Sequence, residues 1–293
     1  MVTAVKHSDS TKGIVAMVVA ALLFTLNDAT SKYLTESFSI WQVLAVRQFF
    51  SLLVIVAYIH MVTGWVSLRV SNGPGMAIRA FFFVATTALI VASIAVLPLA
   101  FVTAIAFSSP IFAVAFSHWL GSENVGARRW TAVVAGFVGV LVVVRPGGAE
   151  FDWVVLLPVA AALTATFRDL VTRPLSKTDS SISILLWSNI AVIVVAWSAT
   201  FLSGFDEIDA TSFALLALNG LLNAGAHFLI IESFRLGEVS LVAPFRYSAL
   251  VWATILGLLI WGDVPDWWTI AGAVLLVASG IYIIERSPGG RSN

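Results

Sequence analysis

Long runs of apolar residues alternate with short polar segments along the whole chain. Between Ala80 and Ser117 no side chain carries a formal charge, and this stretch is about twice the ~20 residues that a helix needs to cross a bilayer. Because a backbone in lipid must satisfy its own hydrogen bonds, we expect these runs to form helices. The pattern predicts ten membrane spans, at 12–34, 40–63, 76–96, 99–120, 129–145, 153–173, 180–203, 212–235, 239–260 and 267–285.

The composition agrees with a membrane protein. Of the 293 residues, 59% are hydrophobic and 11% are charged, whereas soluble domains carry roughly 25% charged residues. The net charge is zero, so no nucleic-acid partner is indicated, and the absence of cysteine excludes disulfides and cysteine-based metal sites. The first apolar run has no Ala-x-Ala cleavage site, and we interpret it as a retained span. We expect an all-α polytopic fold.

The distribution of lysine and arginine predicts the orientation of the spans. If the N-terminus is cytoplasmic, twelve of these cations fall on the inner side and only Lys32, Arg47 and Arg145 on the outer side, with Arg246 inside a span. Cytoplasmic loops are enriched in Lys and Arg. The sequence therefore predicts that both termini are cytoplasmic.

One short pattern occurs twice, 141 residues apart. Ala21, Leu22, Thr25, Asp28, Lys32 and Leu34 fall on Ala162, Leu163, Thr166, Asp169, Arg173 and Leu175. The repeat predicts two halves of five spans: a tail at 1–11, a first repeat at 12–147, a second repeat at 148–286 and a tail at 287–293. Five is odd, so the second half would enter the membrane from the opposite side. Inverted repeats around a central cavity are typical of secondary transporters.

Three stretches resemble a known family. LPLAFVTAIAFSSPIFAVAFSHWLGSE at 97–123, followed by RRWTAVVAGFVGVLVVVRPG at 128–147, is similar to the end of the first repeat of EamA-type proteins in the drug/metabolite transporter superfamily. GEVSLVAPFRYSALVWATILGLLIWGDVP at 237–265 resembles the matching part of the second repeat, and NDATSK at 27–32 with Arg47 resembles the first two helices. One departure is that the acid closing each repeat is Glu123 in the first but Asp263 in the second.

The resemblance implies a fold and a function. It implies ten helices, cytoplasmic termini, a bacterial inner-membrane location and transport of small metabolites, often outward. Within the family the likeness is greatest to an amino-acid exporter. We therefore expect export of amino acids, including apolar and aromatic ones, by alternating access. The alternatives are a proton-coupled antiporter or an uptake transporter of drugs or other metabolites.

Polar residues at mid-span depth are the candidate substrate contacts, because such groups are unfavourable in lipid. Both halves contribute to them: Thr86, Thr87, Ser108, Ser109, Asn219, Asn223, His227, Arg246, Tyr247 and Ser248. Asn219, Asn223 and His227 are spaced four residues apart and share one helix face. They could bind a substrate, or they could bond to a neighbouring helix across Gly220 and Ala224. His227 could also carry a proton.

Charged residues inside spans are the candidate gates. Arg246 could meet a substrate carboxylate, pair with Asp169 or extend to the interface. Arg47 has the same ambiguity, with Asp28 as its candidate partner. Asp28 with Lys32, and Asp169 with Arg173, have the i,i+4 spacing at which side chains meet. They either neutralise each other or close opposite ends of a cavity.

The remaining features change the picture less. Pro110 and Pro244 remove helix hydrogen bonds and predict kinks. No catalytic motif or metal-ligand spacing is present in the sequence, so we expect no enzyme activity, cofactor or metal. A membrane-embedded enzyme or a non-transporting subunit is the alternative from a different class. No carboxylate lies at the midplane, which favours facilitated, gradient-driven movement, with antiport through Asp28 or His227 as the second choice. The partners expected are a small-molecule substrate and the lipid bilayer, and a monomer would suffice.

Overall fold

The computed structural model describes residues 7–63, 68–119, 127–145, 152–236 and 239–285. Over these residues the chain is helical, and no strand occurs in them. The predicted boundary at 147/148, the first-repeat acid Glu123 and the C-terminal tail at 287–293 lie outside the described residues.

The helices follow the predicted spans in order. The first five spans correspond to α1 (His7–Thr35), α2 (Ile40–Tyr58) with a π-helical turn η1 (Ile59–Thr63), α3 (Gly73–Val96), α4 (Leu99–Ala106) with α5 (Ser109–Trp119), and α6 (Ala127–Val144). The second five correspond to η3 (Trp153–Val155) with α7 (Leu156–Leu175), α8 (Ser181–Ser203), α9 (Ala210–Leu236), α10 (Val239–Val242) with η4 (Ala243–Tyr247) and α11 (Ser248–Trp261), and α12 (Trp267–Glu285).

Eight of the helical segments in the described residues are long and apolar enough to cross a membrane. The fifth and tenth predicted spans correspond to shorter apolar helices, Trp130–Val144 and Trp267–Tyr282. The fold is therefore that of a polytopic, all-helical membrane protein, with eight segments that meet the length expected of a span and two that are shorter.

Serine and asparagine side chains mark several helix starts. Ser39 accepts a hydrogen bond from the backbone N–H of Gln42 at the start of α2, and Ser180 accepts one from Ser183 at the start of α8. These caps satisfy N–H groups that have no partner within the helix.

The chain divides into two compact units, and each unit takes segments from both predicted repeats. Unit 1 comprises 1–29, 98–151 and 225–293, and unit 2 comprises 30–97 and 152–224. Two of the four boundaries between the units fall inside α1 and α9. Compact packing therefore does not follow the two halves of the sequence.

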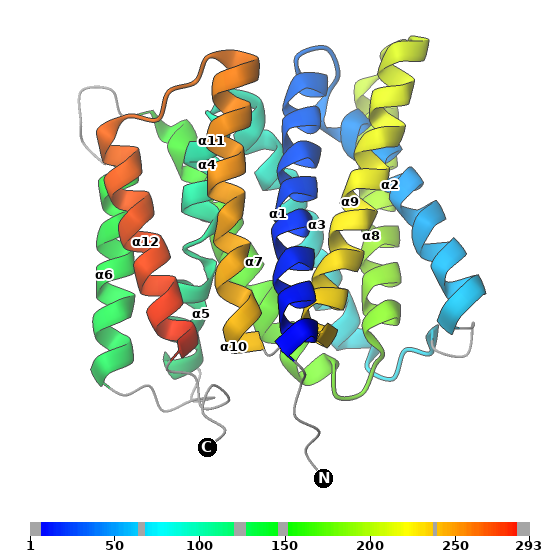
Figure 1. The fold of residues 1–293 in the computed structure, drawn as a ribbon. Coiled ribbons are helices and arrows are strands. Elements are labelled where there is room, and N and C mark those ends of the chain that lie inside the picture. The colour runs from blue at the N-terminus through cyan, green and yellow to red at the C-terminus, as the bar shows by residue number, and fades with distance from the viewer. Residues whose placement is uncertain (1–6, 64–67, 120–126, 146–151, 237–238, 286–293) are drawn as a thin grey trace. The chain divides into compact units, whose positions relative to one another are not determined.

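In unit 1, α4 packs on α11 and α6 packs on α12. Figure 1 shows α6 and α12 side by side, and it shows that α1 begins at the end of this unit where α12 finishes. Two glycines bring α6 and α12 close together: a Cβ on Gly139 would lie 3.1 Å from the carbonyl oxygen of Gly272. Small residues allow this kind of approach between membrane helices.

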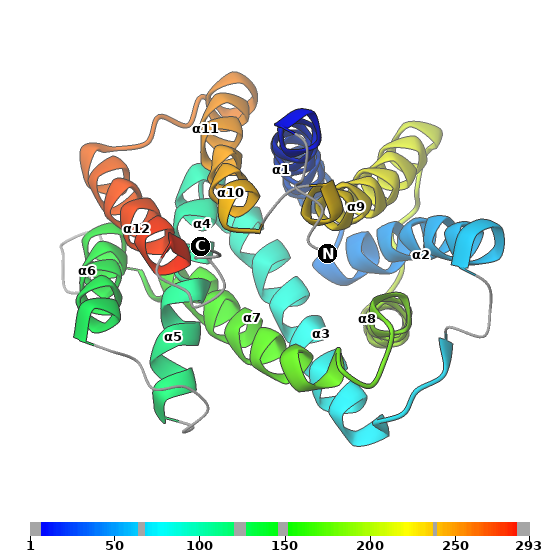
Figure 2. The same ribbon diagram turned by 60° about the horizontal axis from the view of Figure 1, so that its bottom comes forward.

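In unit 2, α3 packs against α7 and α8, and α2 packs against α8. Figure 2 shows α7 crossing α3. Outside the spans, the backbone N–H of Ser71 donates to Asp179 Oδ1 at 2.5 Å, and the Thr178 hydroxyl donates to Asp179 Oδ2 at 2.6 Å. These two hydrogen bonds lower the pKa of Asp179, so its carboxylate stays charged at neutral pH. The contact would weaken only as the pH falls through that lowered pKa.

Candidate functional site

The fourth predicted span is broken between α4 and α5. Phe107 ends α4, and Ser108 donates both its N–H and its hydroxyl to the carbonyl oxygen of Ile105, at 2.9 and 2.6 Å. The chain then restarts as α5, in which the N–H of Ile111 bonds to Ser108 O at 2.9 Å. Pro110 has no N–H, so the carbonyl of Ala106 receives no helical hydrogen bond from it.

The ninth predicted span is interrupted in a similar way. Residues Ala243–Tyr247 form the tighter 3₁₀ turn η4, which contains Pro244, and the N–H of Ser248 bonds back to Phe245 O and Arg246 O. Within this turn Arg246 is exposed and Tyr247 is buried. A 3₁₀ stretch in the middle of a helix often marks a hinge or local strain.

The two breaks lie in the same unit and touch. Phe107 and Tyr247, which are 140 residues apart in the sequence, pack edge to face with ring centroids 4.7 Å apart and an interplanar angle of 62°. The Tyr247 hydroxyl occupies the place that a Cβ on Gly280 of α12 would take. Tyr247 is therefore fixed between the first break and α12, and its hydroxyl faces α12.

Just after the second break, two buried polar atoms have no hydrogen-bond partner among the described residues. They are Ser248 Oγ and Trp252 Nε1. The residues are four apart in α11, so they share one face of its first turn. Buried polar groups are usually paired, and an unpaired one calls for an explanation such as a ligand or water. Ser248 was a sequence candidate. Trp252 was not among the sequence candidates, although its spacing from Ser248 was a usable signal.

Asn219 joins a polar cluster within unit 2. Its Nδ2 donates to Ser31 Oγ at 3.1 Å, and Arg47 donates to the same oxygen at 3.0 Å. All three side chains are buried. They connect α1, α2 and α9, so these groups already have interhelical partners.

Asn223, one turn further along α9, donates to Ser51 Oγ at 3.2 Å. Between the two asparagines, a Cβ on Gly220 would collide with the backbone of α2 at Arg47. The contacts of Asn219 and Asn223 thus correspond to the interhelical alternative that the sequence left open. His227, the third residue of the stripe, belongs to unit 1, where its ring packs edge-on to Phe24 with centroids 4.9 Å apart.

The threonines of α3 and the serine of α5 have simpler surroundings. Thr86 donates to Phe82 O at 2.7 Å and to Thr164 Oγ1 of α7 at 3.1 Å. Thr87 and Ser109 are half-buried.

Arg79 is a functional candidate that sequence reasoning missed. It was counted only among the inner-side cations, although it falls near the start of the predicted span at 76–96. In α3 its Nε donates to Thr172 Oγ1 at 3.2 Å. Its other donors reach Ile184 O at 3.2 Å and Ser188 Oγ. The guanidinium also lies 5.2 Å from the centre of the Phe83 ring. Arg79 therefore ties α3, α7 and α8 together through neutral oxygens.

Three members of the predicted charge pairs have further contacts in the structure. Lys32 donates to Leu97 O, the residue that caps α3, at 2.8 Å. Asp28 accepts a hydrogen bond from Asn27 at 3.0 Å. Asp169 pairs with its neighbour Arg168 at 2.8 Å. The side chain of Arg173 lies outside the described residues.

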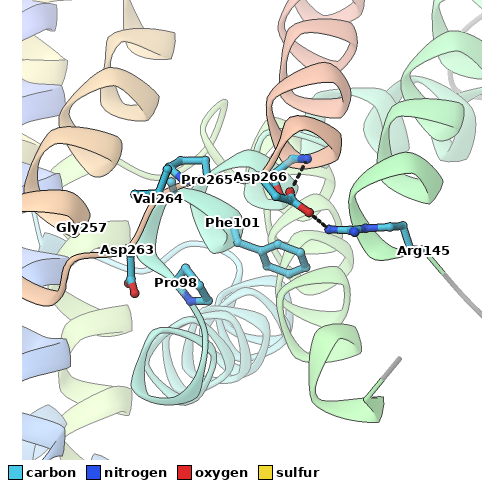
Figure 3. Close-up of a pocket in the computed structure, with 10 residues that line it drawn as sticks. Pro98, Phe101, Arg145, Gly257, Asp263, Val264, Pro265 and Asp266 are labelled. Carbon is cyan, nitrogen blue, oxygen red and sulfur yellow. Dashed lines mark hydrogen bonds and ion pairs between the residues drawn. The ribbon is translucent and has the colours of Figure 1, made fainter. Parts of the chain in front are cut away.

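A small pocket lies where α11 connects to α12. Its volume is about 190 Å³, and its lining includes Pro98, Phe101, Arg145, Asp263 and Asp266. Figure 3 shows Arg145 extending toward Asp266, with which it forms an ion pair, while Asp263 lies beside Pro98. Ligand pockets usually exceed roughly 300 Å³, so this one is too small for most whole metabolites. Among the described residues, no group of three or more His, Cys, Asp or Glu side chains could hold a metal.

Comparison with protein families identifies a match for both halves of the chain. The model of the EamA-like transporter family matches residues 11–145 and again residues 152–285. A solved crystal structure is also similar in fold, with a TM-score of 0.63 and 16% identity over 93% of this chain and 96% of the other.

Curated relatives of similar length are named as transporters. A protein named S-adenosylmethionine uptake transporter from Rickettsia bellii is 30% identical, with 88% of each chain covered. A riboflavin transporter from Vibrio cholerae is 26% identical, over 94% of this chain and 93% of its own. A pseudopaline exporter from Pseudomonas aeruginosa is 24% identical, over 94% and 97%.

Proposed function

Because this chain belongs to the EamA-like transporter family, we propose that it is a secondary transporter of a small metabolite that carries an amino-acid group, bound at the two helix breaks of unit 1. The protein is a multi-pass membrane transporter and not an enzyme, as its family and its relatives' names agree. The observation that carries the site is the pair of breaks joined by Phe107 and Tyr247. Discontinuous helices form the substrate sites of many secondary transporters.

The chemistry at the second break supports a substrate with a carboxylate. Arg246 is exposed in the 3₁₀ turn, and its planar fork suits a carboxylate. The indole N–H of Trp252 can only donate, and the Ser248 hydroxyl can donate or accept. Together they suit a ligand that presents hydrogen-bond acceptors. An amino acid fits, and so does a larger molecule that contains one.

The substrate named for one relative widens this class. S-adenosylmethionine carries an amino-acid group together with a heteroaromatic ring, so it belongs to the proposed class. Riboflavin carries a fused heteroaromatic ring but no amino-acid group, so it lies outside that class. A free amino acid is therefore one member of the proposed class. The relative named for S-adenosylmethionine uptake makes S-adenosylmethionine the probe of choice.

In transport by alternating access, the two predicted repeats would have equivalent roles on opposite sides of the membrane. In this proposal the repeats at 12–147 and 148–286 form ten spans of opposite orientation, and each repeat supplies one of the two breaks. The two breaks would bend in alternation, because each leaves fewer hydrogen bonds holding its helix straight. Asp28 with Lys32, and Asp169 with Arg173, would close opposite ends.

The proposed movement is downhill, with its direction set by the substrate gradient. Relatives are named for uptake and for export, so family membership does not determine direction. Export, which the sequence resemblance implied, and uptake both follow from one facilitated mechanism. Proton-coupled antiport is the second candidate, because histidine side chains inside the membrane, such as that of His227, serve in the proton relays of some transporters.

Proteoliposomes test this proposal. Purified protein should take up radiolabelled S-adenosylmethionine down its gradient, whereas liposomes without protein should not. Unlabelled methionine and phenylalanine should compete. The R246Q variant should raise the KM on the order of tenfold or more, as expected when a charged hydrogen bond is lost. The matched control is R235Q, which removes an exposed cation that pairs with Glu232 at the end of α9.

Trp252→Phe keeps an aromatic ring but removes the N–H, and we expect it to raise the KM roughly fivefold, the value of one hydrogen bond. Equal effects of R246Q and R235Q would contradict the proposed site. Competition by riboflavin with none by amino acids would contradict the substrate class. Accumulation driven by an imposed proton gradient would favour antiport.

A further inference from the structure

An apolar groove runs between α1 and α9 within unit 1. It has a volume of about 360 Å³ and is lined by Thr11, Lys12, Val15, Ala16, Val19 and Leu229. Positions 11, 15 and 19 are spaced four apart, as are 12 and 16, so one face of α1 forms one wall. The small side chain of Ala16 leaves room between its larger neighbours.

The groove opens to the outside of the protein along an apolar helix. Val15 is 56% exposed and Val19 is 38% exposed. From Gly13 to Asn27 the sequence has no charged residue, and this part of α1 belongs to a candidate span. Exposed apolar residues in such a span are suited to contact with lipid chains. The wall from Lys12 to Val19 is about 10 Å long, enough for part of one acyl chain.

A cation stands at one end of this groove. Lys12 is the last charged residue before the apolar run, and it is exposed beside Thr11. On the α9 side, Glu232 accepts a hydrogen bond from Arg235 at 2.7 Å. Together with Lys12 these side chains sum to one positive charge. Among the described side chains at this end of the groove, the net charge is therefore positive.

We propose that this groove binds one anionic phospholipid, with an acyl chain along Val15, Ala16 and Val19 and the headgroup phosphate at Lys12. Lysine at the membrane surface attracts anionic lipid headgroups. The apolar groove and the cation meet at the depth where acyl chain and headgroup join. This site is separate from the helix breaks, so it does not depend on the proposed substrate.

Native mass spectrometry of the full chain tests the site, using equimolar phosphatidylglycerol and phosphatidylcholine in mixed micelles. Wild type should retain phosphatidylglycerol preferentially. K12Q should lower this preference about fivefold, the effect expected for one lysine at an anionic surface. K12R should restore the preference. R69Q, which removes an exposed cation between α2 and α3 on the same predicted side, should not change it.

A variant that fills the groove distinguishes the contact with the lipid acyl chain from the contact between Lys12 and the headgroup. A16L should reduce retention of both lipids, because it occupies the acyl space while Lys12 remains. An unchanged preference in K12Q, or an equal loss in R69Q, would overturn the proposal. A dimer that dissociates in A16L would also overturn it, because a second copy of the chain would then be the occupant. Transport assays on the helix breaks remain interpretable in every case.

Discussion

At the scale of single residues, the contact between Tyr247 and Gly280 holds the second helix break. A Cβ on Gly280 would overlap the Tyr247 hydroxyl. The G280A variant should therefore displace the ring from Phe107 and lower the stability by about 1–3 kcal/mol, which is typical of overpacking. Thermal unfolding in detergent, followed by tryptophan fluorescence, measures the loss. Adding Tyr247→Phe should recover much of it, because the hydroxyl is removed.

Gly225 provides the matched control for this residue. A Cβ there would meet only Leu23 Cδ1, at an ordinary contact distance of 3.4 Å. We expect G225A to unfold at nearly the wild-type temperature. If both alanine variants lost the same stability, the loss would reflect helix glycines in general, and the role of Tyr247 would be refuted.

The sequence pattern predicted which helix face a polar side chain lies on, but not which residue it bonds to. The spacing of Asn219 and Asn223 placed both on one side of α9, yet their partners Ser31 and Ser51 are 188 and 172 residues away in the sequence. No local pattern carries a pairing over that distance. Arg79 was missed for a related reason. A cation near a helix start looks like an ordinary inner-loop residue until three helices supply its acceptors.

At the scale of helices, Pro110 is the clearest test of the proposed bending. Replacing it by alanine gives back an N–H that can bond to Ala106 O. We expect P110A to gain about 1 kcal/mol, the value of one backbone hydrogen bond, or roughly 2–4 °C in the unfolding temperature. S-adenosylmethionine uptake should become slower, because a straighter helix bends less readily. Unfolding temperature and initial uptake rate measured on the same preparation check both effects.

Pro174 provides the control for the P110A variant. It also lies inside a helix, in the last turn of α7, and its replacement by alanine likewise supplies one N–H. P174A should gain a similar amount of stability while uptake stays at the wild-type rate. Faster or unchanged uptake in P110A would show that α4 and α5 do not bend during transport.

Helix breaks were only partly predictable. Pro110 and Pro244 signalled both kinks because proline removes a backbone donor. Their own positions do not match in the two repeats, whereas Phe107 and Tyr247, 140 residues apart, meet in the structure. The contact depends on how α4 packs on α11. Long-range packing of this kind has no signature in a single helix.

At the scale of the whole molecule, hydrophobic runs predicted the order of the helices because span length is set by bilayer thickness. The same argument did not predict the two compact units. Unit 1 and unit 2 each combine segments from both repeats, and α3 packs on α7 in the other half of the sequence. Assignment to units depends on which apolar faces meet, and nearly every face of these helices is apolar.

The predicted topology of ten spans rests most heavily on the two shorter helices, Trp130–Val144 and Trp267–Tyr282. The chain has no cysteine, so single cysteines report their sidedness without background.

If α6 crosses the membrane, E150C should react with an impermeant maleimide in intact cells, whereas E123C should react only after the membrane is opened. If α12 crosses, D266C should react outside and R291C only inside. The excess of Lys and Arg on the predicted inner side supports this orientation. E207C and R69C, in the loops flanking long spans, calibrate outer and inner labelling. If E123C and E150C were labelled from the same side, α6 would not cross the membrane. The first half would then have an even number of spans, whereas inversion requires an odd number.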